Sequence, residues 1–217
     1  MENSLHAIVA KAPVMPVVTL QRGADAVPLA RALLAGGLPV IEITLRTAAG
    51  LEAIRRIRAE VEGVIVGAGT VTTPADVDEA LAAGAEFLVS PGATPALLNA
   101  GVGCGAPFMP GIATASELMV CLDKGLDTLK FFPAHAIGGA NGLKALAGPF
   151  PQVSFCPTGG IGLAQLDEYF AVAAVKTLGG SWMAPASRIA EQDWRGITAL
   201  ATQAAAKVAE LRPRQGD

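Results

Sequence analysis

Segments typical of β-strands alternate with segments typical of α-helices along the whole chain, and this alternation limits the fold more than any other feature of the sequence. Short apolar runs such as residues 40–46 and 65–70 are each followed by a segment with helical periodicity. Alternating strands and helices pack as a parallel sheet that is covered by helices. We therefore expect an α/β fold.

Eight predicted strands each precede a predicted helix, and no low-complexity linker divides them. The predicted strands are residues 14–20, 40–46, 65–70, 87–90, 108–110, 128–133, 154–158 and 175–178, and the predicted helices are residues 26–34, 48–58, 74–83, 95–100, 114–124, 143–147, 163–170 and 193–211. Eight such units favour a single-domain (β/α)₈ TIM barrel over residues 1–217, with a short N-terminal lead-in and a frayed tail at residues 212–217. An open, doubly wound sheet is the alternative.

Composition narrows the class of function. Hydrophobic residues make up 52% of the chain, but no apolar run reaches the length of about 18–20 residues that spans a membrane. The net charge is −3 and both signs are mixed along the chain, which argues against a nucleic-acid or membrane partner. Three widely spaced cysteines and two histidines indicate neither a disulfide framework nor a metal site. We expect a soluble, cytoplasmic protein that acts on a small molecule.

One lysine stands in the middle of an apolar predicted strand. Strand alternation in residues 128–133 places Lys130 and Phe132 on the same face. An ammonium group is costly to bury among phenylalanines, so such a lysine must either be paired or lose its proton. A neutral lysine attacks ketones and forms Schiff bases. The alternative for Lys130 is an exposed position with its charge in water.

The second predicted strand carries polar residues on one face only. Glu42, Thr44 and Arg46 alternate there with isoleucine and leucine. In a barrel, the apolar face meets the helices and the polar face points into the mouth, where active sites lie. Glu42 is therefore predicted to act as a general base, and Arg46 to bind a carboxylate. An exposed ion pair between these two residues is the alternative.

Glycines lie within the third predicted strand and directly after the last two predicted strands. The third strand ends at Thr70, whose hydroxyl we expect on the interior face together with Val66 and Ala68. The last two strands end in Thr158-Gly159-Gly160 and Gly179-Gly180-Ser181. Paired glycine turns in this position are typical of the phosphate site of a barrel, although each pair alone could be only a turn.

Together these residues suggest covalent chemistry on a phosphorylated keto acid. Lys130 is predicted to form the Schiff base and Glu42 to move protons, while Arg46 and Thr70 hold the carboxylate. Four residues are predicted to bind the phosphate, namely Gly159, Gly160, Gly180 and Ser181. Phe132, Pro91 and Thr158 are expected to line the pocket, and His135 is expected to be a loop residue.

A series of motifs, in this order, resembles the family of 2-keto-3-deoxy-6-phosphogluconate aldolases, which are class I pyruvate-dependent aldolases. The motifs are Glu42-Ile43-Thr44-Leu45-Arg46-Thr47, Val66-Gly67-Ala68-Gly69-Thr70-Val71, Ser90-Pro91-Gly92, Pro110-Gly111-Ile112, Lys130-Phe131-Phe132-Pro133-Ala134, Phe155-Cys156-Pro157-Thr158-Gly159-Gly160-Ile161 and Gly179-Gly180-Ser181-Trp182. The resemblance extends from Val14 to about Lys207. The chain departs from the pattern at His135, where many members carry glutamate.

The resemblance implies a homotrimer of (β/α)₈ barrels that works without a cofactor. It assigns the Schiff base to Lys130, acid–base catalysis to Glu42 and carboxylate binding to Arg46 and Thr70. The implied reaction is retro-aldol cleavage to pyruvate and glyceraldehyde 3-phosphate.

Other activities remain open on the sequence alone. Within the family, these are cleavage of the galactonate epimer and of 4-hydroxy-2-oxoglutarate. A phosphosugar isomerase or epimerase barrel would share the phosphate turns but would not need a lysine that forms an imine. A barrel that binds phosphate without catalysis is the third possibility.

Overall fold

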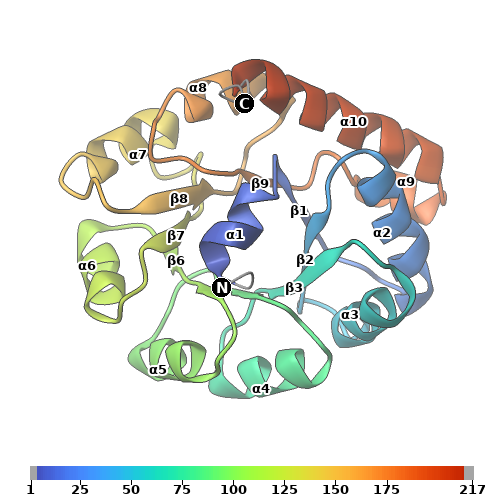
Figure 1. Ribbon diagram of the computed structural model, residues 1–217, viewed down its shortest axis with the longest axis horizontal. Coiled ribbons are helices and arrows are strands. Elements are labelled where there is room, and N and C mark those ends of the chain that lie inside the picture. Colours follow the sequence, from blue (N-terminus) through green and yellow to red (C-terminus); the bar gives the residue numbers. More distant parts are fainter. Residues whose placement is uncertain (1–3, 213–217) are drawn as a thin grey trace.

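The computed structural model describes residues 4–212. Its strands form an inner layer and its helices surround them (Figure 1). The strands are β1 Met15–Val18, β2 Val40–Thr44, β3 Ile65–Gly69, β4 Leu88–Val89, β5 Phe108–Met109, β6 Gly111–Ile112, β7 Thr128–Phe131, β8 Ser154–Pro157 and β9 Gly179–Gly180. The helices are α1 Leu5–Ala10, α2 Ala26–Ala35, α3 Ala49–Glu60, α4 Pro74–Ala82, α5 Pro95–Gly103, α6 Ala115–Asp123, α7 Gly139–Ala147, α8 Leu166–Phe170, α9 Ala186–Ala190 and α10 Trp194–Leu211.

All the strand pairings within the sheets are parallel. Six strands form one curled sheet in the order β5-β4-β3-β2-β1-β9, and β6-β7-β8 form a second sheet. Only Pro110 separates β5 from β6 in the chain. On the other side, single bridges join Phe155 to Val175 and Thr158 to Gly179. The predicted α/β fold with a parallel sheet is therefore confirmed.

Two of the predicted strands are corrected by the structure. The strand predicted at residues 108–110 is divided in two, because Pro110 has no N–H group to continue the ladder, and its carbonyl instead accepts a hydrogen bond from the Lys130 N–H at 2.9 Å. The strand predicted at residues 175–178 is replaced by β9, whose two glycines pair with Met15 and Pro16. The Thr158 side chain occupies the space where a Cβ on Gly179 would lie, so this close approach requires glycine.

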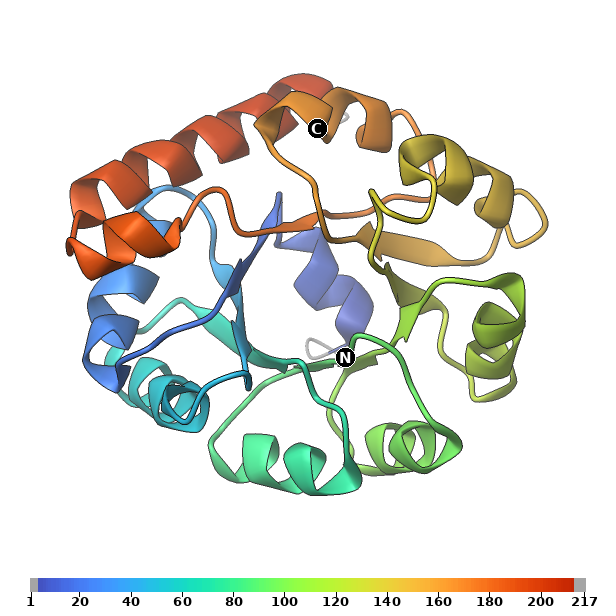
Figure 2. The ribbon, with the colours of Figure 1, turned by 180° about the vertical axis from the view of Figure 1, so that it is seen from behind.

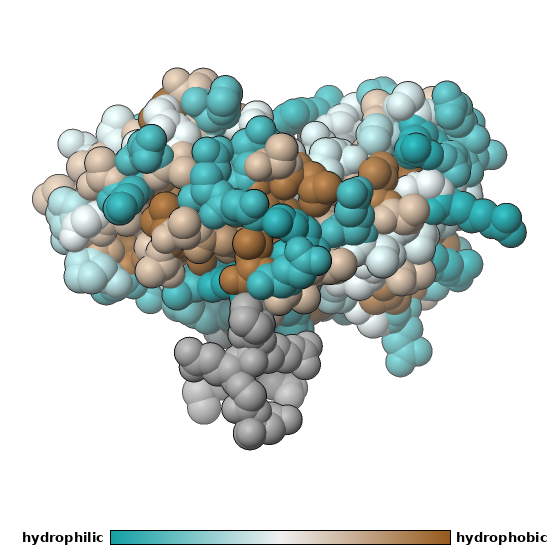
Figure 3. All heavy atoms as spheres, turned by 90° about the horizontal axis from the view of Figure 1, so that it is seen from above, coloured by the Kyte–Doolittle hydropathy of each residue, from teal (hydrophilic) through white to brown (hydrophobic). Residues whose placement is uncertain are grey.

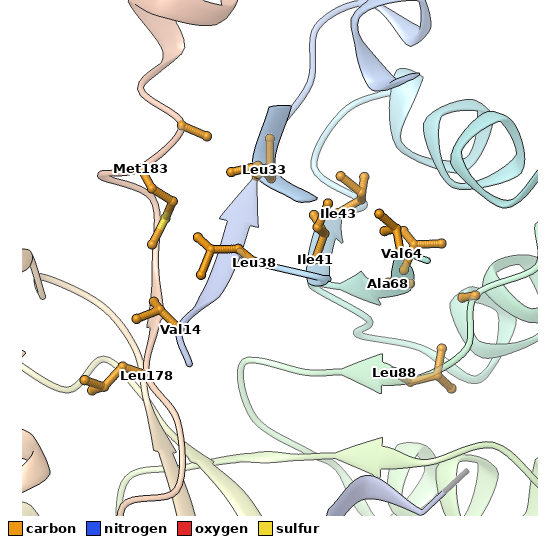
Figure 4. Packing of buried hydrophobic residues seen from close by; sticks show 14 of the residues in the cluster. Val14, Leu33, Leu38, Ile41, Ile43, Val64, Ala68, Leu88, Leu178 and Met183 are labelled. Atoms are coloured by element: carbon orange, nitrogen blue, oxygen red, sulfur yellow. The ribbon is translucent and has the colours of Figure 1, made fainter. Parts of the chain in front are cut away.

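The larger hydrophobic cluster lies between the strands and the helices. Ile41 and Ile43 of β2 and Ala68 of β3 belong to it and are fully buried. Figure 4 shows part of this cluster, in which Val14 and Leu178 lie close together. Because Ile41 and Ile43 alternate with Glu42, the burial of their side chains outside the sheet turns the Glu42 carboxylate inward. The predicted two-faced pattern of this strand is confirmed.

A smaller hydrophobic cluster fills the interior of the curled sheet. It includes Ile8 and Ala12 from the N-terminal region together with Met15, Val40, Phe87, Val89, Met109 and Cys156 from the strands. Helix α1, which was predicted only as a lead-in, lies across the centre of the strands in both Figure 1 and Figure 2. His6 Nε2 lies 3.2 Å from Thr128 Oγ1 at the start of β7. Helix α1 therefore covers the amino-terminal ends of the strands.

The outer face of the molecule around α8 and α10 is of mixed polarity. Figure 3 shows hydrophilic residues spread among smaller groups of hydrophobic ones on this face. In α10, Ile197, Ala201, Ala204 and Val208 are buried, and most of the other residues are exposed or partly exposed. This spacing explains why the helix packs along one side only. Within residues 4–212, no helix combines the length and the apolar character needed to cross a membrane.

Helix α4 begins with a capping box in which Thr73 and Asp76 each bond the other's backbone N–H group. The Asp76 carboxylate also accepts hydrogen bonds from the backbone N–H and the hydroxyl of Thr72, at 2.7 and 2.9 Å. Burial opposes the ionisation of this carboxyl group, but the bonds from Thr72 and Thr73 outweigh that effect. The pKa of Asp76 is therefore lowered from its usual value.

We expect Asp76→Ala to lower the free energy of unfolding by about 0.5–2 kcal/mol at neutral pH. Because the pKa of Asp76 is lower in the folded state, its contribution is fully present above the unfolded-state pKa and is lost as the pH falls through the folded-state pKa. Urea unfolding at neutral pH and at about pH 3 measures this difference. Asp78→Ala, on an exposed position of the same helix, is the control. An equal loss at both pH values would contradict a role for the ionised carboxylate.

Candidate active site

A buried ion pair joins a strand of the six-stranded sheet to a strand of the three-stranded sheet. Lys130 Nζ of β7 lies 3.2 and 3.4 Å from the two carboxylate oxygens of Glu42 of β2. Lys130 is 4% exposed and Glu42 is 2% exposed. The structure therefore excludes the exposed alternative for this lysine. Lys130 Nζ also lies 5.4 Å from the centre of the Phe132 ring. Lys130 and Glu42 were each predicted to face the interior, but the ion pair between them was not predicted.

The glycine at the end of β3 makes room for the Glu42 side chain. Gly69 pairs with Thr44 of the neighbouring strand. A Cβ on Gly69 would collide with the carboxylate of Glu42. At this position the absence of a side chain admits the carboxylate of the neighbouring strand. Glu42 is thus held against Lys130 by the shape of β3 as well as by charge.

Arg46 and Thr70 are brought together at the end of β2 and β3. Arg46 Nε donates a hydrogen bond to Thr70 Oγ1 at 3.1 Å. The structure corrects the reason given for the orientation of Thr70. Val66 and Ala68 belong to the outer hydrophobic cluster, not to the interior face. Regular alternation would turn Thr70 outward as well, but its φ of 59° ends the alternation and directs its hydroxyl to Arg46.

The backbone of Thr70 is strained. A positive φ is unusual for a β-branched residue and costs about 1–3 kcal/mol. Such strain is found most often at functional sites, where the surrounding structure maintains it. The structure therefore maintains the Arg46–Thr70 hydrogen bond even though the backbone of Thr70 is strained.

A cavity of about 410 Å³ opens at the carboxyl ends of the strands. Its lining includes these predicted site residues: Arg46, Phe132, Thr158, Gly159, Gly160, Gly180 and Ser181. The register pairs Lys130 with Cys156, so Phe132 and Thr158 each stand two residues further along their strands, toward the carboxyl ends. The Lys130–Glu42 pair thus lies beneath the floor of the cavity. Pro91 does not line it, and its carbonyl instead packs against Gly111.

Two glycines in the first predicted phosphate turn have positive φ angles. The values are 102° for Gly159 and 72° for Gly160, which favour glycine at both positions. The turn is fixed by the neighbouring loop, because the N–H groups of Ala134 and His135 donate to the carbonyls of Thr158 and Gly159 at 2.8 and 3.0 Å. His135 lies in this loop, as predicted. A Cβ on Gly160 would approach the Cβ of His135 to 2.6 Å.

The Cys156 thiol shares the interior with the ion pair. Burial raises the pKa of Cys156 to about 12, and the nearby Lys130 ammonium only partly offsets this effect. The thiol is therefore protonated at neutral pH and is a poor nucleophile. Among residues 4–212, no group of three or more His, Cys, Asp or Glu residues is arranged to hold a metal ion.

Sequence reasoning missed several residues of the cavity wall. These are Val17, Thr19, Ile161, Ala184, Pro185, Ala186 and Ile189. Thr19 follows β1 and its hydroxyl lies 2.8 Å from that of Thr44. Alternation along β1 from Met15 through Val17 would have placed Thr19 on the interior face. The short helix α9 that carries Ile189 has no comparable signal, because five residues are too few for helical periodicity.

The curled parallel sheet, the buried lysine–carboxylate pair and the adjoining cavity together define an α/β enzyme of the aldolase class. The family model described as KDPG and KHG aldolase matches residues 5–200. The chain belongs to this family, whose initials stand for 2-keto-3-deoxy-6-phosphogluconate and 4-hydroxy-2-oxoglutarate. The resemblance noted in the sequence is confirmed.

Two similar proteins with assigned names support membership in the same aldolase family. The chain is 49% identical to the 2-dehydro-3-deoxy-phosphogluconate aldolase of Dickeya dadantii, over 94% of this chain and 96% of that protein. It is 48% identical to the KHG/KDPG aldolase of Escherichia coli, over 94% and 95% of the two chains.

Solved structures of relatives have the same fold. The KDPG aldolase of Legionella pneumophila, with pyruvate captured as a covalent carbinolamine, superposes with a TM-score of 0.90 at 44% identity and covers 93% of this chain and 98% of its own. The Zymomonas mobilis enzyme with 3-phosphoglycerate gives 0.90 at 47% identity, covering 95% of this chain and 97% of its own.

Proposed function

We propose that this protein is a class I aldolase that cleaves 2-keto-3-deoxy-6-phosphogluconate to pyruvate and glyceraldehyde 3-phosphate. The observation that carries the proposal is the buried contact of 3.2 Å between Lys130 Nζ and Glu42 Oε1 beneath the cavity. This contact places an amine and a proton acceptor side by side in a site that excludes most water. Relatives at 48–49% identity carry the names of this activity.

Covalent catalysis begins at Lys130. Glu42 accepts a proton from the Lys130 ammonium, and the neutral amine attacks the C2 ketone of the substrate to form a carbinolamine. Glu42 returns its proton to the carbinolamine hydroxyl, which leaves as water, and this gives a protonated Schiff base and restores the Glu42 carboxylate. This cation attracts the electron pair of the C3–C4 bond, and the C4 hydroxyl proton passes to the Glu42 carboxylate, directly or through water. The bond breaks, glyceraldehyde 3-phosphate leaves, and the C3 carbon becomes part of an enamine.

The second half of the reaction reverses these proton transfers. The enamine takes up a proton at C3, which restores the Schiff base, and water then attacks its C2 carbon. Collapse of the resulting carbinolamine releases pyruvate and returns the Lys130 amine. Glu42 is the group beside Lys130 that can supply the C3 proton, because its carboxylate lies 3.2 Å from Nζ.

The remaining site residues position the two ends of the substrate. Arg46 and Thr70 lie beyond Glu42 at the carboxyl ends of their strands and offer a guanidinium and a hydroxyl to the carboxylate next to C2. The turns at residues 159–160 and 180–181 line the cavity and offer backbone N–H groups to the phosphate. Phe132 and Thr158 form the cavity wall between Lys130 and these turns.

Cleavage of 4-hydroxy-2-oxoglutarate to pyruvate and glyoxylate is a second activity that we propose for the same site. The family description includes this substrate, and the Escherichia coli relative carries both names. The pyruvate half of the reaction is identical for the two substrates. Because 4-hydroxy-2-oxoglutarate has no phosphate group, the turns at residues 159–160 and 180–181 would have no phosphate to bind.

The test is incubation with pyruvate and borohydride, followed by peptide mass analysis. A reduced pyruvyl adduct confined to the peptide that contains Lys130 is the expected result. Release of glyceraldehyde 3-phosphate from the phosphorylated substrate is then measured with a coupled dehydrogenase. If correctly folded protein gives no adduct, the aldolase mechanism is wrong, and the phosphosugar isomerase becomes the better candidate.

We further propose that the chain forms a single domain, a closed (β/α)₈ barrel, and that it assembles as a homotrimer in the cytoplasm. Two single bridges, one to Val175 before β9 and one to Gly179 within β9, and the single residue between β5 and β6 support closure of the two sheets into a ring. The three free thiols suit a reducing compartment. Val102, Met119 and Val120 on α5 and α6 are 46–55% exposed and support a contact with a second copy.

Replacing Met119 by glutamate should dissociate the trimer, because each interface would then have to bury a charge. Sedimentation velocity at micromolar concentration should show the mass of a single chain for this variant. Gln203→Glu on the exposed side of α10 adds the same charge elsewhere and should leave the assembly unchanged. If the Met119 variant sediments with the same assembly mass as the unaltered protein, the interface does not include Met119.

A further inference from the structure

Two threonine hydroxyls form a pair in the wall of the active-site cavity. The register pairs Val17 with Glu42, so Thr19 stands beside Thr44, two residues further along each strand. The hydroxyl oxygens are 2.8 Å apart. Thr44 is completely buried, whereas Thr19 is partly exposed and lines the cavity. Thr19 is thus the member of the pair that a ligand can reach.

The direction of the hydrogen bond between the two hydroxyls follows from burial. Each hydroxyl has one proton to donate, and only one of the two protons can lie between the oxygens. Within residues 4–212, Thr19 is the only hydrogen-bond partner of the Thr44 hydroxyl. If Thr19 were the donor, the Thr44 proton would be buried without an acceptor, at a cost of about 1–3 kcal/mol. Thr44 therefore donates to Thr19, and the Thr19 proton is left to point into the cavity.

The position of β1 in the sheet determines which part of a substrate meets this proton. Strand β1 lies between β2, which carries Glu42, and β9, which leads to the turn at residues 180–181. In the proposed reaction, Glu42 serves the C4 hydroxyl and this turn serves the phosphate on C6. Thr19 lines the cavity between these two points. The substrate atom that belongs there is the C5 hydroxyl.

We propose that Thr19 is a specificity-determining residue that binds the C5 hydroxyl of the substrate, and that Thr44 positions it. This inference rests on the proposed function. In the direction of synthesis, the C5 hydroxyl is the hydroxyl next to the carbonyl of the aldehyde. The enzyme is therefore built for phosphorylated α-hydroxyaldehydes, with Thr19 donating to the hydroxyl oxygen.

The test compares two aldehydes in the condensation with pyruvate: glyceraldehyde 3-phosphate, and 3-oxopropyl phosphate, which lacks the hydroxyl. Thr19→Val keeps the shape of the side chain but removes the hydroxyl. We expect this variant to lose about tenfold in kcat/KM with glyceraldehyde 3-phosphate, the effect of one neutral hydrogen bond, and to keep its rate with the deoxy aldehyde. Thr19→Ser retains the hydroxyl and should retain the preference.

Variants of Thr44 separate positioning from binding. Thr44→Val leaves the Thr19 hydroxyl in place but removes the bond that directs it, so the preference between the two aldehydes should fall by less than in Thr19→Val. Thr44→Ser should restore the preference. Thermal unfolding of each variant identifies a general loss of stability, which would lower the rates with both aldehydes equally.

The outcomes are distinguishable from a failure of the proposed function. If the unaltered protein forms the pyruvyl adduct and condenses glyceraldehyde 3-phosphate, but Thr19→Val keeps the same preference between the aldehydes, the role of Thr19 is wrong and the aldolase stands. An equal loss with both aldehydes would also overturn it, because the hydroxyl would then serve the structure alone. If the unaltered protein gives no adduct and no condensation, the proposed function itself fails.

Discussion

Replacement of Lys130 by arginine is expected to lower kcat by about 10⁴-fold or more, as does the loss of the nucleophile in other enzymes that use covalent catalysis. Arginine keeps the positive charge beside Glu42, but its guanidinium remains protonated and cannot attack a ketone. The variant should therefore keep the ion pair with Glu42 but be unable to form the Schiff base. Steady-state cleavage assays measure the loss, and mass spectrometry after pyruvate and borohydride treatment should show no adduct.

Arginine is a better substitute here than an apolar residue. Lys130→Met would leave the Glu42 carboxylate buried without a counter-charge, which is expected to cost about 3–5 kcal/mol of stability. Loss of activity in that variant could then reflect unfolding. Lys144→Arg, at an exposed position of α7, is the matched control and should leave both activity and adduct formation unchanged. Retention of more than about a hundredth of the activity in Lys130→Arg would contradict the Schiff-base mechanism, since the isomerase alternative needs no imine.

Replacement of Glu42 by glutamine is expected to separate the two stages of the reaction. Loss of a general acid–base group lowers the rate by about 10²–10⁴-fold, so cleavage of the C3–C4 bond should slow by that factor. The glutamine has nearly the shape of the glutamate and fits beside Gly69, but it cannot take up a proton. The ammonium of Lys130 then lacks a counter-charge in a buried site, which favours the neutral amine. Adduct formation with pyruvate should therefore persist.

Rapid-quench assays of cleavage and borohydride trapping, performed on the same preparation, test this separation. Glu210→Gln removes a carboxylate from an exposed position of α10 and should behave as the unaltered protein does. If the Glu42 variant lost the adduct as completely as Lys130→Arg, the carboxylate would be needed for Schiff-base formation itself. If it cleaved at the full rate, another group would have to accept the C4 hydroxyl proton.

Local pattern was sufficient to predict the fold class and half of the residues that line the cavity. Alternation along β2 predicts that Glu42 and Arg46 share the interior face, because their apolar neighbours must meet the helices. The same rule failed for Thr70, where a positive φ interrupts the alternation. A single strained residue leaves no periodic signal, so its orientation follows only from the contact with Arg46.

Contacts across the sheet could not be predicted from the sequence. Lys130 and Glu42 are 88 residues apart, and their distance depends on how strongly the sheet curls. The function of Gly69 depends on the same contact, because its missing side chain is needed only where the Glu42 carboxylate passes. Helix α1 was missed for a different reason: six residues are too few for a periodic signal, and its Ser4 cap is a weak marker.

Helix α1 closes the end of the interior that lies opposite the cavity, so the interior is open at the cavity end only. Ile8 and the surrounding interior side chains close the end below Lys130. In the proposed reaction, reactants therefore reach this lysine and leave it through the cavity. A bound sugar phosphate would fill the cavity and so block this opening while it reacts. Once the aldehyde has departed, the reactive enamine is approached from the side just vacated, with Glu42 as the neighbouring proton donor. The new C–H bond at C3 is therefore expected to form on one face of the enamine, a selection that only isotopically labelled substrate would reveal, because the methyl group of pyruvate carries three identical hydrogens.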